Sequence, residues 1–71
     1  MTGYHYILVY STSHALQLEK LLNAAGVATR LVPVPRHLSS DCGVCLRISP
    51  EGLETSRQVI AGSRIEIQGI M

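Results

Sequence analysis

The order of the predicted elements constrains this chain most, because a strand–helix–strand pattern occurs twice within 71 residues. β-Branched, aromatic and alternating apolar residues predict strands over 4–10, 27–34, 44–48 and 64–70. Helices are predicted over 14–25, after N-cap residues at 11–13 and ending at Gly26, and over 50–61, ending at Gly62. This βαββαβ order is typical of an α+β ferredoxin-like sandwich, with an antiparallel four-stranded sheet and two helices on one face. Pro33 and Pro35 favour an edge position for the second strand, so we expect the first and third strands at the centre.

Length and composition narrow the class of protein. The chain is long enough for a single domain over residues 1–71. Hydrophobic residues make up 46% of it and charged residues 15%, a balance that excludes intrinsic disorder. The net charge is +1 without a basic run, which argues against nucleic-acid binding. No apolar run approaches the roughly 20 residues of a membrane helix, and the first residues lack the pattern of a signal peptide. We therefore expect a cytoplasmic protein that binds neither nucleic acid nor membrane.

The predicted topology gives Cys42 a distinctive position. In this sheet the third strand begins at the end where the first strand finishes, and the first helix begins there too. Cys42 should therefore lie near the run Ser11-Thr12-Ser13-His14, where a helix N-terminus favours an anionic thiolate. Gly43 leaves the backbone beside the sulfur bare, so another molecule can approach it. Arg36 would add positive potential from the same loop.

Other uses of the two cysteines remain open at this stage. Either thiol could be an inert structural residue, and Cys45 more readily so because it lies inside a strand. Cys42 and Cys45 form a C-x-x-C spacing, but three strand steps span roughly 10 Å, whereas a disulfide needs Cα atoms within about 7 Å. A closed zinc site needs four ligands, and no second cysteine pair or close histidine pair is present. We expect no metal and no cofactor.

Several runs of residues resemble a known family. They are Tyr6-Ile7-Leu8-Val9, the helix over 11–22, and the run Pro35-Arg36 followed by Ser39-Ser40-Asp41-Cys42-Gly43 before a strand. Together they resemble the selenium/sulfur carrier-like family of small bacterial proteins, also catalogued as a domain of unknown function. The resemblance implies a cytoplasmic domain that holds a chalcogen on a cysteine and passes it on. That role falls on Cys42, whereas Cys45 stands where the family usually has an aliphatic residue.

Two functions follow from these observations. As a carrier, the chain would hold sulfur or selenium on Cys42 as a persulfide or selenyl-sulfide. It would receive the atom from a cysteine desulfurase or a selenium-donor protein and pass it to an acceptor protein. No general base is evident, which suits a carrier better than an enzyme. The alternative is a non-catalytic regulatory module that binds a protein or ligand at its open sheet face and tolerates Cys42→Ser.

The first strand also predicts an association surface. Its two faces are both fairly apolar, and only one of them can be covered by the helices. The other face carries four large side chains, Tyr4, Tyr6, Leu8 and Tyr10. We therefore expect either a homo-oligomer or a protein partner at this face.

Overall fold

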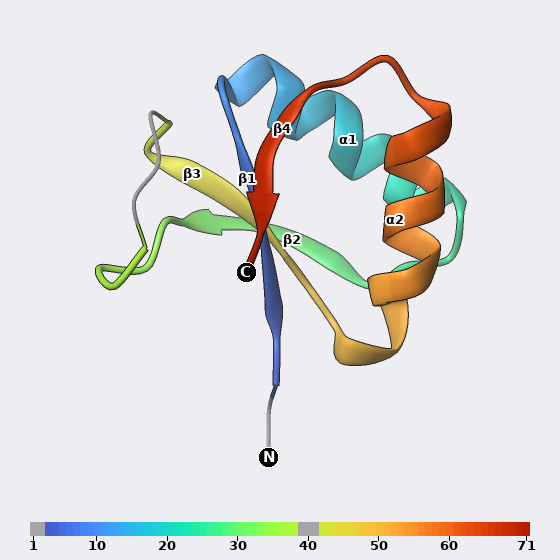
Figure 1. Cartoon of the computed structure of the whole chain (residues 1–71), viewed down its shortest axis with the longest axis horizontal. Helices are drawn as coiled ribbons and strands as arrows, with labels where there is room; N and C mark the ends of the chain where they lie inside the picture. The colour runs from blue at the N-terminus through green and yellow to red at the C-terminus, as the bar shows by residue number, and fades with distance from the viewer. Residues whose placement is uncertain (1–2, 39–41) are drawn as a thin grey trace.

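The computed structural model describes residues 3–38 and 42–71. Ser39, Ser40 and Asp41, which belong to the run that resembles the family, lie outside the described residues. The elements are β1 (His5–Val9), α1 (Thr12–Ala24), β2 (Thr29–Pro33), β3 (Val44–Ile48), a 3₁₀ turn (Pro50–Gly52), α2 (Leu53–Gly62) and β4 (Ile67–Ile70). The strands form one antiparallel sheet in the order β2-β3-β1-β4. The predicted ferredoxin-like fold is confirmed, with β1 and β3 at the centre (Figure 1).

The hydrophobic core lies between the two helices and one face of the sheet, and Figure 1 shows α1 and α2 on the same side of the strands. Alternate residues of the central strands supply its sheet layer, because successive strand side chains point to opposite faces. The fully buried core side chains are Ile7, Val9, Leu46 and Ile48 from the sheet and Ala15, Leu18 and Leu22 from α1. Among the described residues, no helix is long and apolar enough to cross a membrane.

Both ends of α1 are fixed by local chemistry. Ser11 has an extended backbone, and its hydroxyl accepts a hydrogen bond from the backbone N–H of His14 at 3.3 Å, which makes it the N-cap. The helix therefore begins two residues before the predicted start. Beyond its end, Gly26 has φ +85°, the left-handed conformation predicted for that glycine.

The buried side of α1 differs from the predicted stripe. From the sequence alone, the spacing of Leu18, Leu21, Leu22 and Ala25 at i, i+3, i+4 and i+7 predicts these four as the apolar face. Leu21 and Ala25 are exposed, however, and Ala15 is buried instead. Residues 15, 18 and 22 repeat at three- and four-residue steps on one helix face, whereas Leu21 and Ala25 fall beyond the edge of that face.

Three predicted elements are shorter or less regular than expected. β2 begins at Thr29 because the N–H of Val27 still donates to the carbonyl of Leu22 at 2.9 Å, which extends the end of α1. β4 begins at Ile67 because the Ser63 hydroxyl donates to the Ile60 carbonyl at 2.9 Å and accepts from the Ile65 N–H at 3.2 Å. The predicted helix over 50–61 opens as a 3₁₀ turn, in which the backbone of Gly52 packs closely against Val27.

Candidate functional site

Cys42 lies directly before β3, beside the first residue of α1. Its Sγ is 3.8 Å from the Thr12 hydroxyl oxygen, a contact that joins residues 30 positions apart in the sequence. The N–H of Val34 donates to the carbonyl of Gly43 at 3.1 Å, so the segment beside Cys42 is tied to the end of β2. The predicted proximity of Cys42 to the start of the first helix is therefore confirmed. Thr12 is part of the N-cap run that the sequence places near this loop, but no sequence signal identifies its hydroxyl as the partner of the thiol.

The Cys42 side chain is more enclosed than a loop position suggests. It is 8% exposed and belongs to the hydrophobic core that α1 covers. Gly43 beside it is exposed, and no atom within the described residues lies within 4 Å of the position that a Cβ would take there. The sulfur is therefore held beside the first turn of α1, next to an exposed glycine.

The other predicted site residues are Ser13, His14 and Arg36, and they differ in their position relative to Cys42. Ser13 and His14 lie in the first turn of α1, next to Thr12. The N–H of His14 is engaged by the Ser11 cap, so this donor serves the helix end. Arg36 is exposed on the segment after β2, where the part of the chain that the structure describes offers it no hydrogen bond or ion pair.

Cys45 is a buried thiol on the opposite sheet face. Its side chain is fully buried, and its register partners are Leu8 on β1 and Val32 on β2. Burial is the main reason why the pKa of the Cys45 thiol is raised above its ordinary value. The negative charge of a nearby Cys42 thiolate raises this pKa further. The neighbours of Cys45 in the strand, Val44 and Leu46, point to the core face, where Leu46 is a core residue and Val44 packs against the core. Cys45 is nevertheless more buried than Val44, because apolar neighbours cover it on the face that no helix covers.

The two cysteines form no disulfide. Within residues 3–38 and 42–71, no group of three or more histidine, cysteine or carboxylate side chains is arranged to hold a metal ion.

Comparison with known proteins identifies the family. The model of the family described as "Putative Se/S carrier protein-like" matches residues 4–71, which is nearly the whole chain. The chain belongs to this family. The resemblance drawn from the run around Cys42 and from the first strand and helix is confirmed.

A curated relative of this Se/S carrier-like chain is the protein named "Uncharacterized protein YtiA" of Escherichia coli strain K12. The two are 36% identical over 55 residues, which cover 78% of this chain and 65% of the relative. The chain thus spans just under two thirds of the relative's length. No solved structure matches the chain.

Proposed function

We propose that this Se/S carrier-like protein holds one sulfur or selenium atom on Cys42, as a persulfide or selenyl-sulfide, and passes it to an acceptor protein in the cytoplasm. Membership of the family supports the carrier role in general. The observation that supports Cys42 as the carrying residue is the 3.8 Å contact of its Sγ with Thr12 at the N-terminus of α1. A helix N-terminus bears roughly half a positive charge and stabilises an anion placed beside it.

The loading step is an exchange between a thiol and a persulfide. The Cys42 thiolate attacks the outer sulfur of a persulfide on the donor, a cysteine desulfurase or its selenium-handling counterpart. A bond forms between Cys42 Sγ and the transferred atom, the donor's sulfur–sulfur bond breaks, and the donor cysteine leaves as a thiolate. The electron pair moves with the leaving group, so no external oxidant or reductant is needed.

Unloading repeats the same chemistry in the other direction. A nucleophile of the acceptor attacks the outer chalcogen atom, and Cys42 leaves as a thiolate. Both steps require a partner group to approach along the line of the bond that breaks. Gly43, next to Cys42, is exposed and carries no side chain, which supports such an approach.

The remaining site residues have supporting roles in this proposal. Ser13 and His14, in the first turn of α1, contribute to the positive end of the helix that faces the sulfur. Arg36 is exposed and lies in the same connection between β2 and β3, where its charge attracts an anionic donor or acceptor surface. Arg36 would therefore help the partner protein to find and orient itself at the site, since a charge at the rim of an interface mainly changes the association rate.

Intact-mass spectrometry tests the carrier function. The purified protein is incubated with a cysteine desulfurase and cysteine, or with a selenocysteine-cleaving enzyme and selenocysteine. The proposal expects a mass increase of one chalcogen atom that dithiothreitol removes. The absence of any adduct with both donors would contradict the carrier role and favour a binding module in its place.

A further inference from the structure

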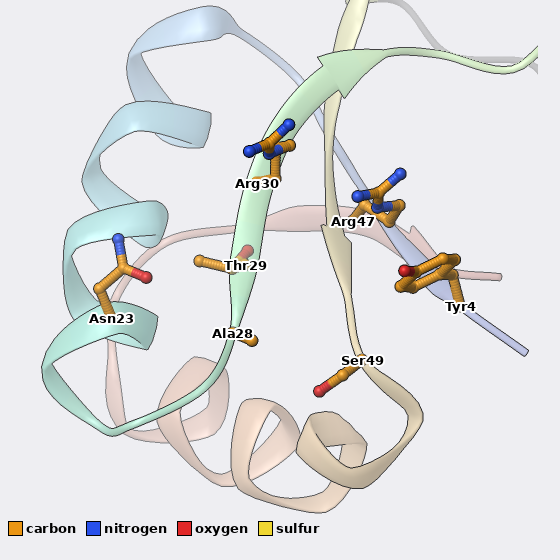
Figure 2. A pocket seen from close by; sticks show the side chains of 7 residues that line it. All are labelled: Tyr4, Asn23, Ala28, Thr29, Arg30, Arg47 and Ser49. Carbon is orange, nitrogen blue, oxygen red and sulfur yellow. The ribbon is translucent and has the colours of Figure 1, made fainter. Parts of the chain in front are cut away.

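A second, distinct feature lies at the other end of the sheet, around the edge strand β2. A shallow cavity of about 530 Å³ is lined in part by Tyr4, Asn23, Arg30, Arg47 and Ser49. Figure 2 shows the guanidinium groups of Arg30 and Arg47 projecting from the neighbouring strands β2 and β3, with the Tyr4 ring beside Arg47. From this juxtaposition we propose that the cavity binds a phosphate group, carried by a small phosphorylated molecule.

The two arginines are direct cross-strand partners. Arg30 is paired with Arg47 in the register of β2 and β3, so their side chains leave the same face of the sheet. Like charges placed directly opposite each other destabilise a sheet. No carboxylate among the described residues lines the cavity, and neither arginine forms an ion pair with any of those residues. A bound anion would therefore relieve a repulsion that the described residues do not compensate.

Arg47 is also held in place. Its guanidinium carbon lies 4.3 Å from the centre of the Tyr4 ring, a cation–π arrangement that restricts the orientation of the fork. A pre-oriented fork loses less conformational entropy when it binds an oxyanion. Tyr4 is 43% exposed, so part of its ring is left for the organic portion of a ligand.

The chemistry of the lining favours phosphate over a carboxylate. Each guanidinium presents parallel N–H donors that match two oxygens of one oxyanion. Two such forks on adjacent strands supply two positive charges, which match the dianionic form of a phosphate monoester. The Ser49 hydroxyl and the Asn23 amide add neutral donors at the same cavity.

This site is separate from the proposed carrier site. Arg47 is three residues beyond Val44, so it lies about 10 Å along β3 from the end of the sheet where Cys42 is found. Its side chain also leaves the face opposite to Leu46 and Ile48, which belong to the core that includes Cys42. A phosphate held by the two arginines would therefore not touch the Cys42 sulfur, and the inference does not depend on the carrier function.

The test is a titration followed by NMR of the ¹⁵N-labelled protein at constant ionic strength. Inorganic phosphate and phenyl phosphate are the two probes, and acetate is the carboxylate control. We expect saturable shifts of the backbone amides of Arg30, Arg47 and Ser49 with both phosphates. Tighter binding of phenyl phosphate would indicate an organic phosphate that uses Tyr4, and equal binding would indicate recognition of the phosphate group alone. Equal saturation by acetate, or shifts that never saturate, would overturn the proposal.

Variants locate the binding to the arginine pair. Arg30→Gln and Arg47→Gln should each weaken phosphate binding about tenfold or more, since a hydrogen bond to a charged group contributes about 1.5–3 kcal/mol. Arg64→Gln removes an exposed arginine that does not line the cavity and should leave the affinity unchanged. Arg30 is exposed, so its variant tests the site even if Arg47→Gln disturbs the packing on Tyr4. Affinity unchanged in Arg30→Gln, or reduced equally in Arg64→Gln, would contradict the proposed site.

Discussion

The sulfur of Cys42 lies 3.8 Å from the hydroxyl oxygen of Thr12, which joins the entry to β3 to the first residue of α1. This contact follows from the topology. β1 and β3 are antiparallel neighbours, so the end of β1, where α1 begins, lies beside the start of β3. The fold thus brings a thiol from one half of the chain to a helix N-terminus from the other.

Removing the Thr12 hydroxyl should slow the chemistry of Cys42. Thr12→Val keeps the shape of the side chain but removes the group that can donate to a thiolate. A hydrogen bond contributes about 0.5–1.5 kcal/mol, so we expect the rate of alkylation of Cys42 by iodoacetamide to fall several-fold. Thr55→Val, at an exposed position of α2, is the matched control and should react like the unmodified protein. Equal rates in both variants would show that the contact does not activate the sulfur.

The two cysteines should differ in reactivity and in its dependence on pH. Cys42 is 8% exposed and lies next to the exposed Gly43, whereas Cys45 is fully buried and its pKa is raised. A raised pKa keeps Cys45 protonated to a higher pH than an ordinary thiol, and only the thiolate is nucleophilic. Iodoacetamide at neutral pH should therefore label Cys42 first, and Cys45 should gain reactivity only in alkaline solution.

Peptide mapping of samples labelled from neutral to alkaline pH checks this order, with the protein unfolded in guanidinium chloride as the control in which both thiols react. Labelling of Cys45 before Cys42 in the folded protein would contradict it. A Cys42–Cys45 disulfide as the main product of mild oxidation would also contradict it, because it would show that the two thiols meet.

The close contact between Gly52 and Val27 should limit substitution at that glycine. A Cβ on Gly52 would lie 2.6 Å from Val27 Cγ1, and both residues are buried. Overpacking of this kind typically costs about 1–3 kcal/mol, so Gly52→Ala should lower the free energy of unfolding by that amount. Gly62→Ala, whose Cβ meets no atom of the described residues within 4 Å, is the control and should be close to neutral. Urea denaturation measures both, and equal stabilities would mean that Val27 moves aside at little cost.

The open face of the sheet should support association. Tyr4 and Tyr10 are exposed there, on the side of β1 that the helices leave uncovered. We expect self-association or a protein partner at this face, and Tyr10→Ser should weaken it while Leu16→Ser, on the exposed side of α1, should not. Light scattering over a range of concentrations, with pull-downs, checks this. A strict monomer that captures no partner would contradict the expectation.

The sequence predicted the topology well because the element order and the turn residues are local signals. Gly26, for example, marks the end of α1 by its conformational freedom, and Pro33 fits the edge strand β2. It predicted less well which side chains are buried, because burial depends on neighbours from other strands. Cys45 is covered by Leu8 and Val32, a relationship that exists only once the register is set.

The candidate sites show the same difference between what local sequence signals predict and what depends on contacts between distant residues. The position of Cys42 beside α1 could be predicted, because it follows from strand direction alone. Its enclosure and its contact with Thr12 could not, because they depend on where the side chain turns after the loop. The pairing of Arg30 with Arg47 likewise depends on register, and single arginines in strands give no signal of it.

Locating the transferred atom tests the central claim most directly. After loading with a cysteine desulfurase and cysteine, the intact protein is fragmented in the mass spectrometer and the extra sulfur is assigned to a residue. We predict that it lies on Cys42, that Cys42→Ser carries none, and that Cys45→Ala is loaded like the unmodified protein. Extra sulfur on Cys45, or loading that persists in Cys42→Ser, would contradict the assignment of Cys42 as the carrier residue.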